Sequence, residues 1–256
     1  MRLIIWSMTT ALLAPWCPPS GDDVASTSEA VNRFLARHDP PLASAVALRH
    51  LEATTRGGAM SGWIDACTAL DAGTLRYWIV AEGGSGAVRK RALVAALDGE
   101  VKAQREGHAS RARLDPDNYE FLPAVVEDGL LRVGLKPRRK DAMLIEGTMA
   151  LSSDDADLIS VEGRLVKAPS FWTHQVHVVR RYERTTGVRV PVSMESTAKV
   201  LIVGTSTFAM TYRYLSINGR AVEAPAPGPD PRICAAAPGA ARFPSRQLQP
   251  QAGVAP

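Results

Sequence analysis

Residues 188–200 read VRVPVSMESTAKV, and apolar and polar side chains alternate along this stretch. The even-numbered positions carry mainly Val, Met and Ala, whereas the odd-numbered positions carry Arg, Ser, Glu and Lys. A period of two residues is typical of a β-strand with one apolar and one polar face. Pro191 has no backbone N–H to donate, so it predicts an edge position or a bulge in this strand.

The same period extends over the second half of the chain, from Tyr119 onward. Apolar and polar residues alternate over 131–135, and apolar residues share one face over 143–151 and another over 206–214. Turn-forming residues separate these stretches at 127–129, 137–141, 152–157, 185–187 and near 204. The pattern predicts about seven antiparallel strands in a meander. Because strands and helices do not alternate, a parallel sheet is not expected.

The first third of the chain has a helical period instead. The spacing of its apolar residues predicts a helix capped by Ser26 or Thr27, a second helix that opens at Leu42 and ends before Gly57, and a third over about 86–106. Two short strands are expected between the last two helices, near 61–69 and 74–81.

The apolar face of the sheet must be covered, and the N-terminal helices are the available cover. The expected fold is therefore α+β: a strongly curved antiparallel sheet, an unclosed β-barrel, with helices packed in its concave face.

The two ends of the chain differ in composition from the middle. Residues 1–25 combine one early positive charge with a short apolar run and predict a signal peptide, hence export to the periplasm. Residues 221–256 are rich in Pro, Ala and Gly and predict a disordered tail, which leaves 26–220 as the folded domain. With Cys234 in that tail, we expect Cys67 and Cys234 to be unpaired thiols.

The overall composition is that of a globular protein. The 256 residues are 46% hydrophobic, and 30 basic against 26 acidic side chains give a net charge of +4. These values exclude a wholly disordered, collagen-like or coiled-coil chain. No apolar run of about 18 to 20 residues follows the N-terminus, so no internal membrane-spanning helix is expected.

No group of residues indicates catalysis or a bound metal. The motif G-x-S-x-G is absent from the sequence, and so are the partner motifs that S-x-x-K requires. His174 and His177 form H-x-x-H, but on the predicted strand these positions face opposite sides. We therefore expect neither an enzyme nor a cofactor, and no metal site.

Four segments of the chain resemble a known family. They are residues 162–172 (EGRLVKAPSFW), 178–182 (VVRRY), 187–191 (GVRVP) and 210–212 (MTY). These segments are similar to bacterial outer-membrane lipoprotein-sorting-like (LolA/LolB-like) proteins, in a largely uncharacterised subgroup. The resemblance implies an unclosed barrel with helices on its concave side, and a cavity that in carriers of this fold holds the acyl chains of lipoproteins.

The apolar face of the sheet is the main candidate ligand site. Eight residues are predicted to line it: Ile145, Met149, Val190, Val192, Met194, Phe208, Met210 and Tyr212. Flexible, polarisable methionines suit an acyl chain. With the resemblance, this face predicts a periplasmic lipid- or lipoprotein-binding protein. The alternative is a packed core inside a filled barrel, in a non-enzymatic envelope interaction or stress-sensor protein.

Two further surfaces are candidate contacts with a membrane or a partner. Phe171 and Trp172 form an aromatic pair between strands, and Arg138, Arg139 and Lys140 belong to a basic cluster at the end of a hairpin. Exposed, they fit a membrane, a lipid or an envelope protein. Alternatively, the aromatic pair is buried over the mouth of the barrel and the basic cluster is a solvated turn. We expect a monomer, and no nucleic acid as partner.

Overall fold

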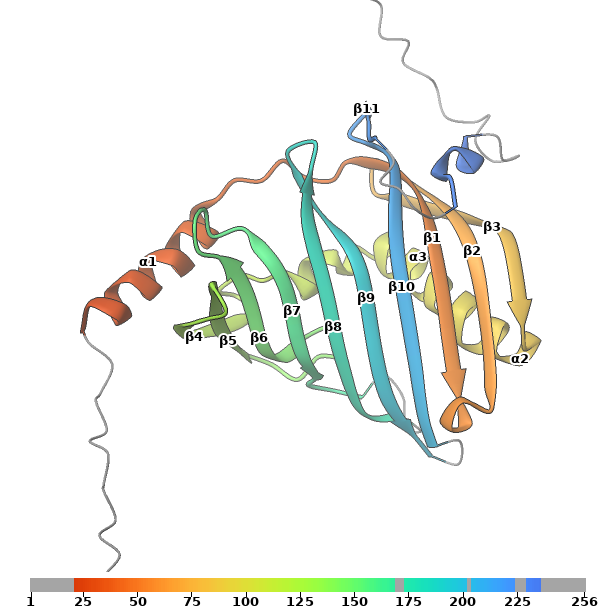
Figure 1. Ribbon diagram of the computed structural model, residues 1–256, viewed down its shortest axis with the longest axis horizontal. Helices are drawn as coiled ribbons and strands as arrows, with labels where there is room; N and C mark the ends of the chain where they lie inside the picture. The colour runs from red at the N-terminus through yellow and green to blue at the C-terminus, as the bar shows by residue number, and fades with distance from the viewer. Residues whose placement is uncertain (1–20, 169–172, 202–203, 224–228, 236–256) are drawn as a thin grey trace, which may run out of the picture.

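The computed structural model describes residues 21–168, 173–201, 204–223 and 229–235 (Figure 1). These residues form one antiparallel sheet of eleven strands in the order β3-β2-β1-β10-β9-β8-β7-β6-β5-β4, with β11 paired to β10. The strands are β1 (Ser44–Thr55), β2 (Met60–Asp71), β3 (Thr74–Gly84), β4 (Tyr119–Glu127), β5 (Leu130–Pro137), β6 (Ile145–Ser152), β7 (Leu158–Leu165), β8 (Thr173–Thr185), β9 (Val188–Val200), β10 (Gly204–Ile217) and β11 (Arg220–Ala221).

The predicted meander is confirmed. Strands β4 to β10 are consecutive neighbours in the sheet, and each pairs antiparallel with the next. The register between β8 and β9 shifts where Arg181 lies opposite Ser193 and Tyr182 opposite Pro191. Pro191 therefore lies at a bulge, one of the two positions that its missing N–H allows.

The helices lie against this sheet. They are α1 (Gly21–Ala36), α2 (Gly86–Val88), η2 (Arg89–Val94), which is π-helical, and α3 (Ala95–Arg105), with short 3-10 turns η1 (Arg56–Gly58), η3 (His108–Ala112) and η4 (Pro231–Cys234). Segments α2, η2 and α3 follow one another without a break and are called the long helix, residues 86–105. This confirms the helix predicted over about 86–106.

The two helical parts cover different regions of the sheet. In Figure 1 the long helix lies behind the sheet, and α1 lies at the flank formed by β4 and β5. Leu93 and Leu97 of the long helix pack on Leu51, Ile64 and other apolar residues of β1 and β2. The sheet is strongly curved and does not close, because β3 and β4 form its two edges. The predicted α+β fold, an unclosed barrel with helices in its concave face, is confirmed.

The helix predicted to open at Leu42 is wrong. Residues 44–55 form β1, which pairs along its whole length with β2 and along most of it with β10. The local sequence SAVALRHLEATT is rich in Ala, Leu, Arg and Glu, which favour helices. Pairing on both edges outweighs this preference, because a central strand satisfies all its backbone donors and acceptors within the sheet.

The prediction that both cysteines are unpaired thiols is also wrong. Cys67 and Cys234 form a disulfide, with their Cα atoms 5.4 Å apart. Both are fully buried, in a cluster with Leu48 whose partly buried members include Trp78. The 3-10 turn η4 thus covers part of the sheet next to β1 and β2, within the segment 221–256 that we expected to be a tail. The composition of that segment does not reveal this short apolar attachment.

The disulfide predicts a measurable contribution to stability. It links residues that are 167 positions apart, and closing so long a loop restricts the unfolded chain. Reduction, or the double substitution Cys67→Ser with Cys234→Ser, should lower the free energy of unfolding by about 2–4 kcal/mol in urea titrations. The double variant should not respond to reductant, and equal urea midpoints for the oxidised and reduced wild type would contradict the prediction.

Candidate functional site

Three adjoining cavities lie between the long helix and the concave faces of β1, β9 and β10, and we call them together the groove. The upper cavity, of about 230 Å³, includes Ala47 and Tyr214 in its lining. The middle cavity, of about 420 Å³, includes Leu51 and Met210. The lower cavity, of about 640 Å³, includes Phe208 and further residues of β1, β9 and the long helix.

The cavities follow one another along the strands. The upper and middle cavities share four lining residues: Glu100, Gln104, Pro191 and Tyr212. The middle and lower cavities are lined by alternate residues of the same strands, Leu51 and Ala53 in β1, and Met210 and Phe208 in β10. Six residues of strand separate Ala47 from Ala53, so the groove extends over about 20 Å.

Small side chains leave this space open. The long helix presents Ala92 to the lower cavity and Ala96 to the middle one. The strands present Ala47 to the upper cavity, and Ala53 and Ala198 to the lower one. Alanines at facing positions cannot fill the gap between a helix and a sheet, whereas Leu93 and Leu97 on the same helix reach the sheet and bury themselves. The helix therefore touches the sheet along one side and leaves the groove along the other.

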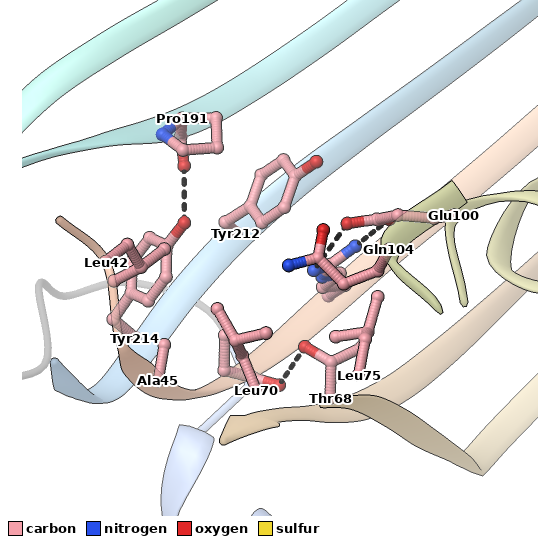
Figure 2. A pocket seen from close by; sticks show the side chains of 12 residues that line it. Leu42, Ala45, Thr68, Leu70, Leu75, Glu100, Gln104, Pro191, Tyr212 and Tyr214 are labelled. Atoms are coloured by element: carbon pink, nitrogen blue, oxygen red, sulfur yellow. Dashed lines mark hydrogen bonds and ion pairs between the residues drawn. The ribbon is translucent and has the colours of Figure 1, made fainter. Parts of the chain in front are cut away.

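The upper end of the groove combines polar and charged side chains with apolar ones such as Leu70 and Leu75 (Figure 2). Arg49, only 7% exposed, donates to both carboxylate oxygens of Glu100, at 2.5 and 3.2 Å. Its guanidinium also lies over the ring of Tyr212, 4.7 Å from the centroid. The Tyr214 hydroxyl donates to the carbonyl of Pro191 at 3.0 Å. This end joins the long helix to β1 through one ion pair.

Burial and neighbouring charges together set the protonation states of Arg49 and Tyr212. Burial alone would lower the pKa of Arg49, but the adjacent carboxylate of Glu100 more than offsets it, so the pKa is raised and the guanidinium stays charged. Burial raises the pKa of Tyr212 to about 12, and the charge of Arg49 opposes this shift. The Tyr212 hydroxyl is therefore protonated at neutral pH and available as a hydrogen-bond donor.

Half of the eight predicted site residues line the groove. Met194, Met210 and Tyr212 line the middle cavity, and Phe208 lines the lower one. The other four do not line these cavities. Ile145 and Met149 are buried in the core cluster that includes Phe34 of α1. Val190 is buried in another cluster, with Tyr214 and Ile217, and Val192 is half-buried beside the register shift between β8 and β9. The period of two residues identifies a face of the sheet, but not which part of that face a helix covers.

Sequence analysis missed the contribution of β1 and the charged residues. Leu51 and Ala53 were assigned to a helix, and Arg49 and Glu100 were not considered. The buried positions along β1 show which side chains face the core, but this pattern comes from the structure and could not have identified the strand from the sequence. For Arg49 and Glu100, which are 51 positions apart, no local pattern indicates the contact.

The predicted membrane or partner contacts at Arg138, Arg139 and Lys140 stay a prediction, and the structure shows only where these side chains lie. Arg138 donates to the carbonyls of Pro116 and Tyr119 at 2.7 and 3.2 Å, and Arg139 donates to the carbonyl of Arg111 at 3.1 Å. These two arginines thus contact neighbouring loops, and all three residues of the basic cluster, Arg138, Arg139 and Lys140, are exposed. Phe171 and Trp172 lie outside the described residues.

Neither a metal centre nor a membrane-spanning helix is found among the described residues. No group of three or more His, Cys, Asp or Glu side chains in those residues could hold a metal ion. Over the same part of the chain, no helix combines the length and the apolar character needed to cross a membrane.

The protein is therefore of the class in which an unclosed, curved antiparallel sheet carries a helix on its concave face, with an elongated groove between the two. No protein-family model and no curated protein matches the sequence. Among solved structures, similarity extends to an outer membrane lipoprotein-sorting protein domain from Vibrio parahaemolyticus, with a TM-score of 0.37 and 9% identity over 75% of this chain and 92% of that one.

Two further solved structures are similar to the same degree. A DUF1329 family protein from Desulfovibrio piger has a TM-score of 0.34 and 11% identity, over 73% of this chain and 90% of that one. A LolA superfamily protein from Nitrosomonas europaea has a TM-score of 0.32 and 10% identity, over 75% and 90%. All three are too distant to bear on function, which has to be inferred from the groove itself.

The Arg49–Glu100 pair predicts how firmly the long helix is held. Substitution Glu100→Ala leaves a buried guanidinium without its carboxylate, which is costly, although the 40% exposure of the Glu100 side chain reduces the effect. We expect the free energy of unfolding to fall by about 1–3 kcal/mol in urea titrations. In the matched control, Glu106→Ala removes exposed contacts with Lys102 and His108 and should cost less than about 0.5 kcal/mol. Equal losses would contradict the assignment.

Proposed function

We propose that this protein binds lipid, with the acyl chain of a lipid or lipoprotein lying in the groove. The observation that supports the proposal is the groove itself, an elongated space beside apolar side chains of β1, β9, β10 and the long helix. The middle and lower cavities, of about 420 and 640 Å³, are each large enough for part of an aliphatic chain. Methionines at its centre, Met194 and Met210, can adapt to the shape of a flexible chain.

The energy available from burial is sufficient for reversible binding. Each buried methylene contributes about 0.8 kcal/mol, so ten contribute about 8 kcal/mol. Association costs at least about 4 kcal/mol in lost freedom of motion, so a chain needs most of the length of the groove to bind usefully. Movement of the long helix, held at its upper end by Arg49 and Glu100, would admit and release the chain.

The setting of this function is part of the proposal. A signal peptide over 1–25 would export the protein to the periplasm, where it would act as a monomeric, non-enzymatic carrier of a lipid or lipoprotein. The alternative, an envelope interaction or stress-sensor protein with a filled barrel, is favoured by the region near α1, where side chains such as Phe34 and Met149 are packed. The two functions differ in whether an amphiphile binds.

The proposal predicts that filling the groove abolishes binding. Ala96 faces the middle cavity and is otherwise exposed, so Ala96→Phe places a ring in the space without displacing a core residue. We expect the affinity for 11-(dansylamino)undecanoic acid, measured by fluorescence titration, to fall at least tenfold, about 1.4 kcal/mol.

Residue 95 provides the matched control. Ala95 is exposed on the same turn of the long helix and does not line the groove, so Ala95→Phe should leave the affinity unchanged. Urea titrations should show both variants folded. Equal affinities of the two variants and the wild type, or no saturable binding by the wild type, would contradict the proposal, and the second result would favour the envelope interaction or stress-sensor function.

A further inference from the structure

One row of the concave face passes through the middle cavity and crosses most of the sheet. Cross-strand pairing places its members directly opposite one another on strands β5, β6, β7, β8, β9, β10, β1 and β2, in the order Val133, Met149, Val161, Arg180, Met194, Met210, Leu51 and Ile64. Paired residues share a face of a sheet. Every member of the row is apolar except Arg180.

Arg180 lies between Val161 and Met194 in this row and lines the middle cavity. Its Nε atom is buried and has no hydrogen-bond partner. Within the described part of the chain, no carboxylate forms an ion pair with it, since Glu100, which lines the same cavity, pairs with Arg49. A guanidinium among apolar side chains costs free energy unless an anion or hydrogen-bond acceptor compensates it.

The neighbour of Arg180 shows the contrast. Arg181 is exposed on the opposite face of β8, and its Nη1 atom lies 2.7 Å from a carboxylate oxygen of Glu195. Adjacent arginines on one strand therefore differ in environment: Arg181 forms an ion pair at the surface, whereas Arg180 lines the cavity and forms no ion pair with a described carboxylate.

Two tyrosines line the same cavity as Arg180. Tyr182 and Tyr212 line it together with Arg180, and Tyr212 remains protonated at neutral pH because burial raises its pKa to about 12. Since Glu100 balances the charge of Arg49, the guanidinium of Arg180 leaves a net positive charge in the middle cavity. The lower cavity, next along the strands, is lined by apolar residues such as Phe208 and Val88, together with Arg56, Arg91 and several Thr and Ser side chains. The guanidinium of Arg180 thus lies in a cavity that neighbours a second one with a partly apolar lining.

We propose that Arg180 binds the anionic head group of a single-chain amphiphile whose tail extends into the lower cavity. The inference rests on the proposed lipid-binding function and names the ligand class: an acyl chain that ends in a carboxylate or a phosphate. The planar guanidinium donates two parallel hydrogen bonds to either oxyanion. Such a ligand supplies the acceptor that Arg180 lacks and buries its tail beside Met194 and Met210.

The test compares amphiphiles that share one chain and differ in the head. Palmitic acid, palmitoyl lysophosphatidic acid and neutral monopalmitoyl glycerol are titrated into the full-length protein by calorimetry, below their micelle concentrations. The wild type should bind at least one of the two anionic ligands at least tenfold more tightly than the neutral one. Arg180→Gln should remove that preference by weakening the anionic ligand at least tenfold and the neutral one less than threefold.

Arg181→Gln is the matched control, because it removes the same charge from the same strand on the other face, and it should leave all affinities unchanged. Preference for palmitate over lysophosphatidate, or the reverse, identifies the oxyanion and supports the inference. If all three ligands bind the wild type equally, Arg180 is not the head-group site, although lipid binding by the groove stands. The same conclusion follows if Arg180→Gln and Arg181→Gln change the three affinities to the same extent.

If no ligand binds the wild type, both the inference and the proposed function fail. The wild-type comparison remains decisive even if Arg180→Gln does not fold.

Discussion

The pairing of β1 with β10 determines where everything else in the molecule lies. It joins the N-terminal strands to the meander that ends in β10, and it brings side chains such as Thr54 and Thr207, 153 positions apart, within 2.7 Å. Without it, the sheet would divide into a three-stranded and an eight-stranded part, and the groove would lose the wall shared by Leu51 and Met210. The long helix follows β3 directly, so its position over the concave face also depends on this pairing.

The groove exists because the helix is held close to the sheet but not packed against all of it. Leu93 and Leu97 fix one side of the helix, and the Arg49–Glu100 pair fixes its upper end. Along the rest, alanines such as Ala92 and Ala96 face alanines and other small residues of the strands. Space lined by apolar atoms forgoes van der Waals contacts and lowers stability. An occupant of matching shape recovers those contacts, which is the physical basis for ligand binding here.

Much of the fold follows from local patterns. The period of two residues from Tyr119 onward predicted β4 to β10, and the spacing in 86–106 predicted the long helix. The prediction failed for 44–55, where good helix formers become a central strand through pairing with β2 and β10. It failed again for Cys234, because its partner Cys67 is 167 positions away in β2 and no local pattern indicates the contact.

The candidate site was predictable only in part, for the same reason. Met194 and Met210 could be assigned to the apolar face, and they line the groove. Ile145 and Met149 have the same alternation, but α1 lies over their part of the sheet and they are core. Arg180 and Arg181 are adjacent in the sequence and chemically identical. Only the register of β8 with β7 and β9 shows which one faces inward.

Native mass spectrometry of the wild-type protein, purified gently from its own cells, tests lipid binding most directly. The account predicts a complex heavier than the protein by the mass of an acyl-chain amphiphile, which is released as an anion on activation. A protein that carries no adduct and takes up no palmitate when the acid is added would contradict it.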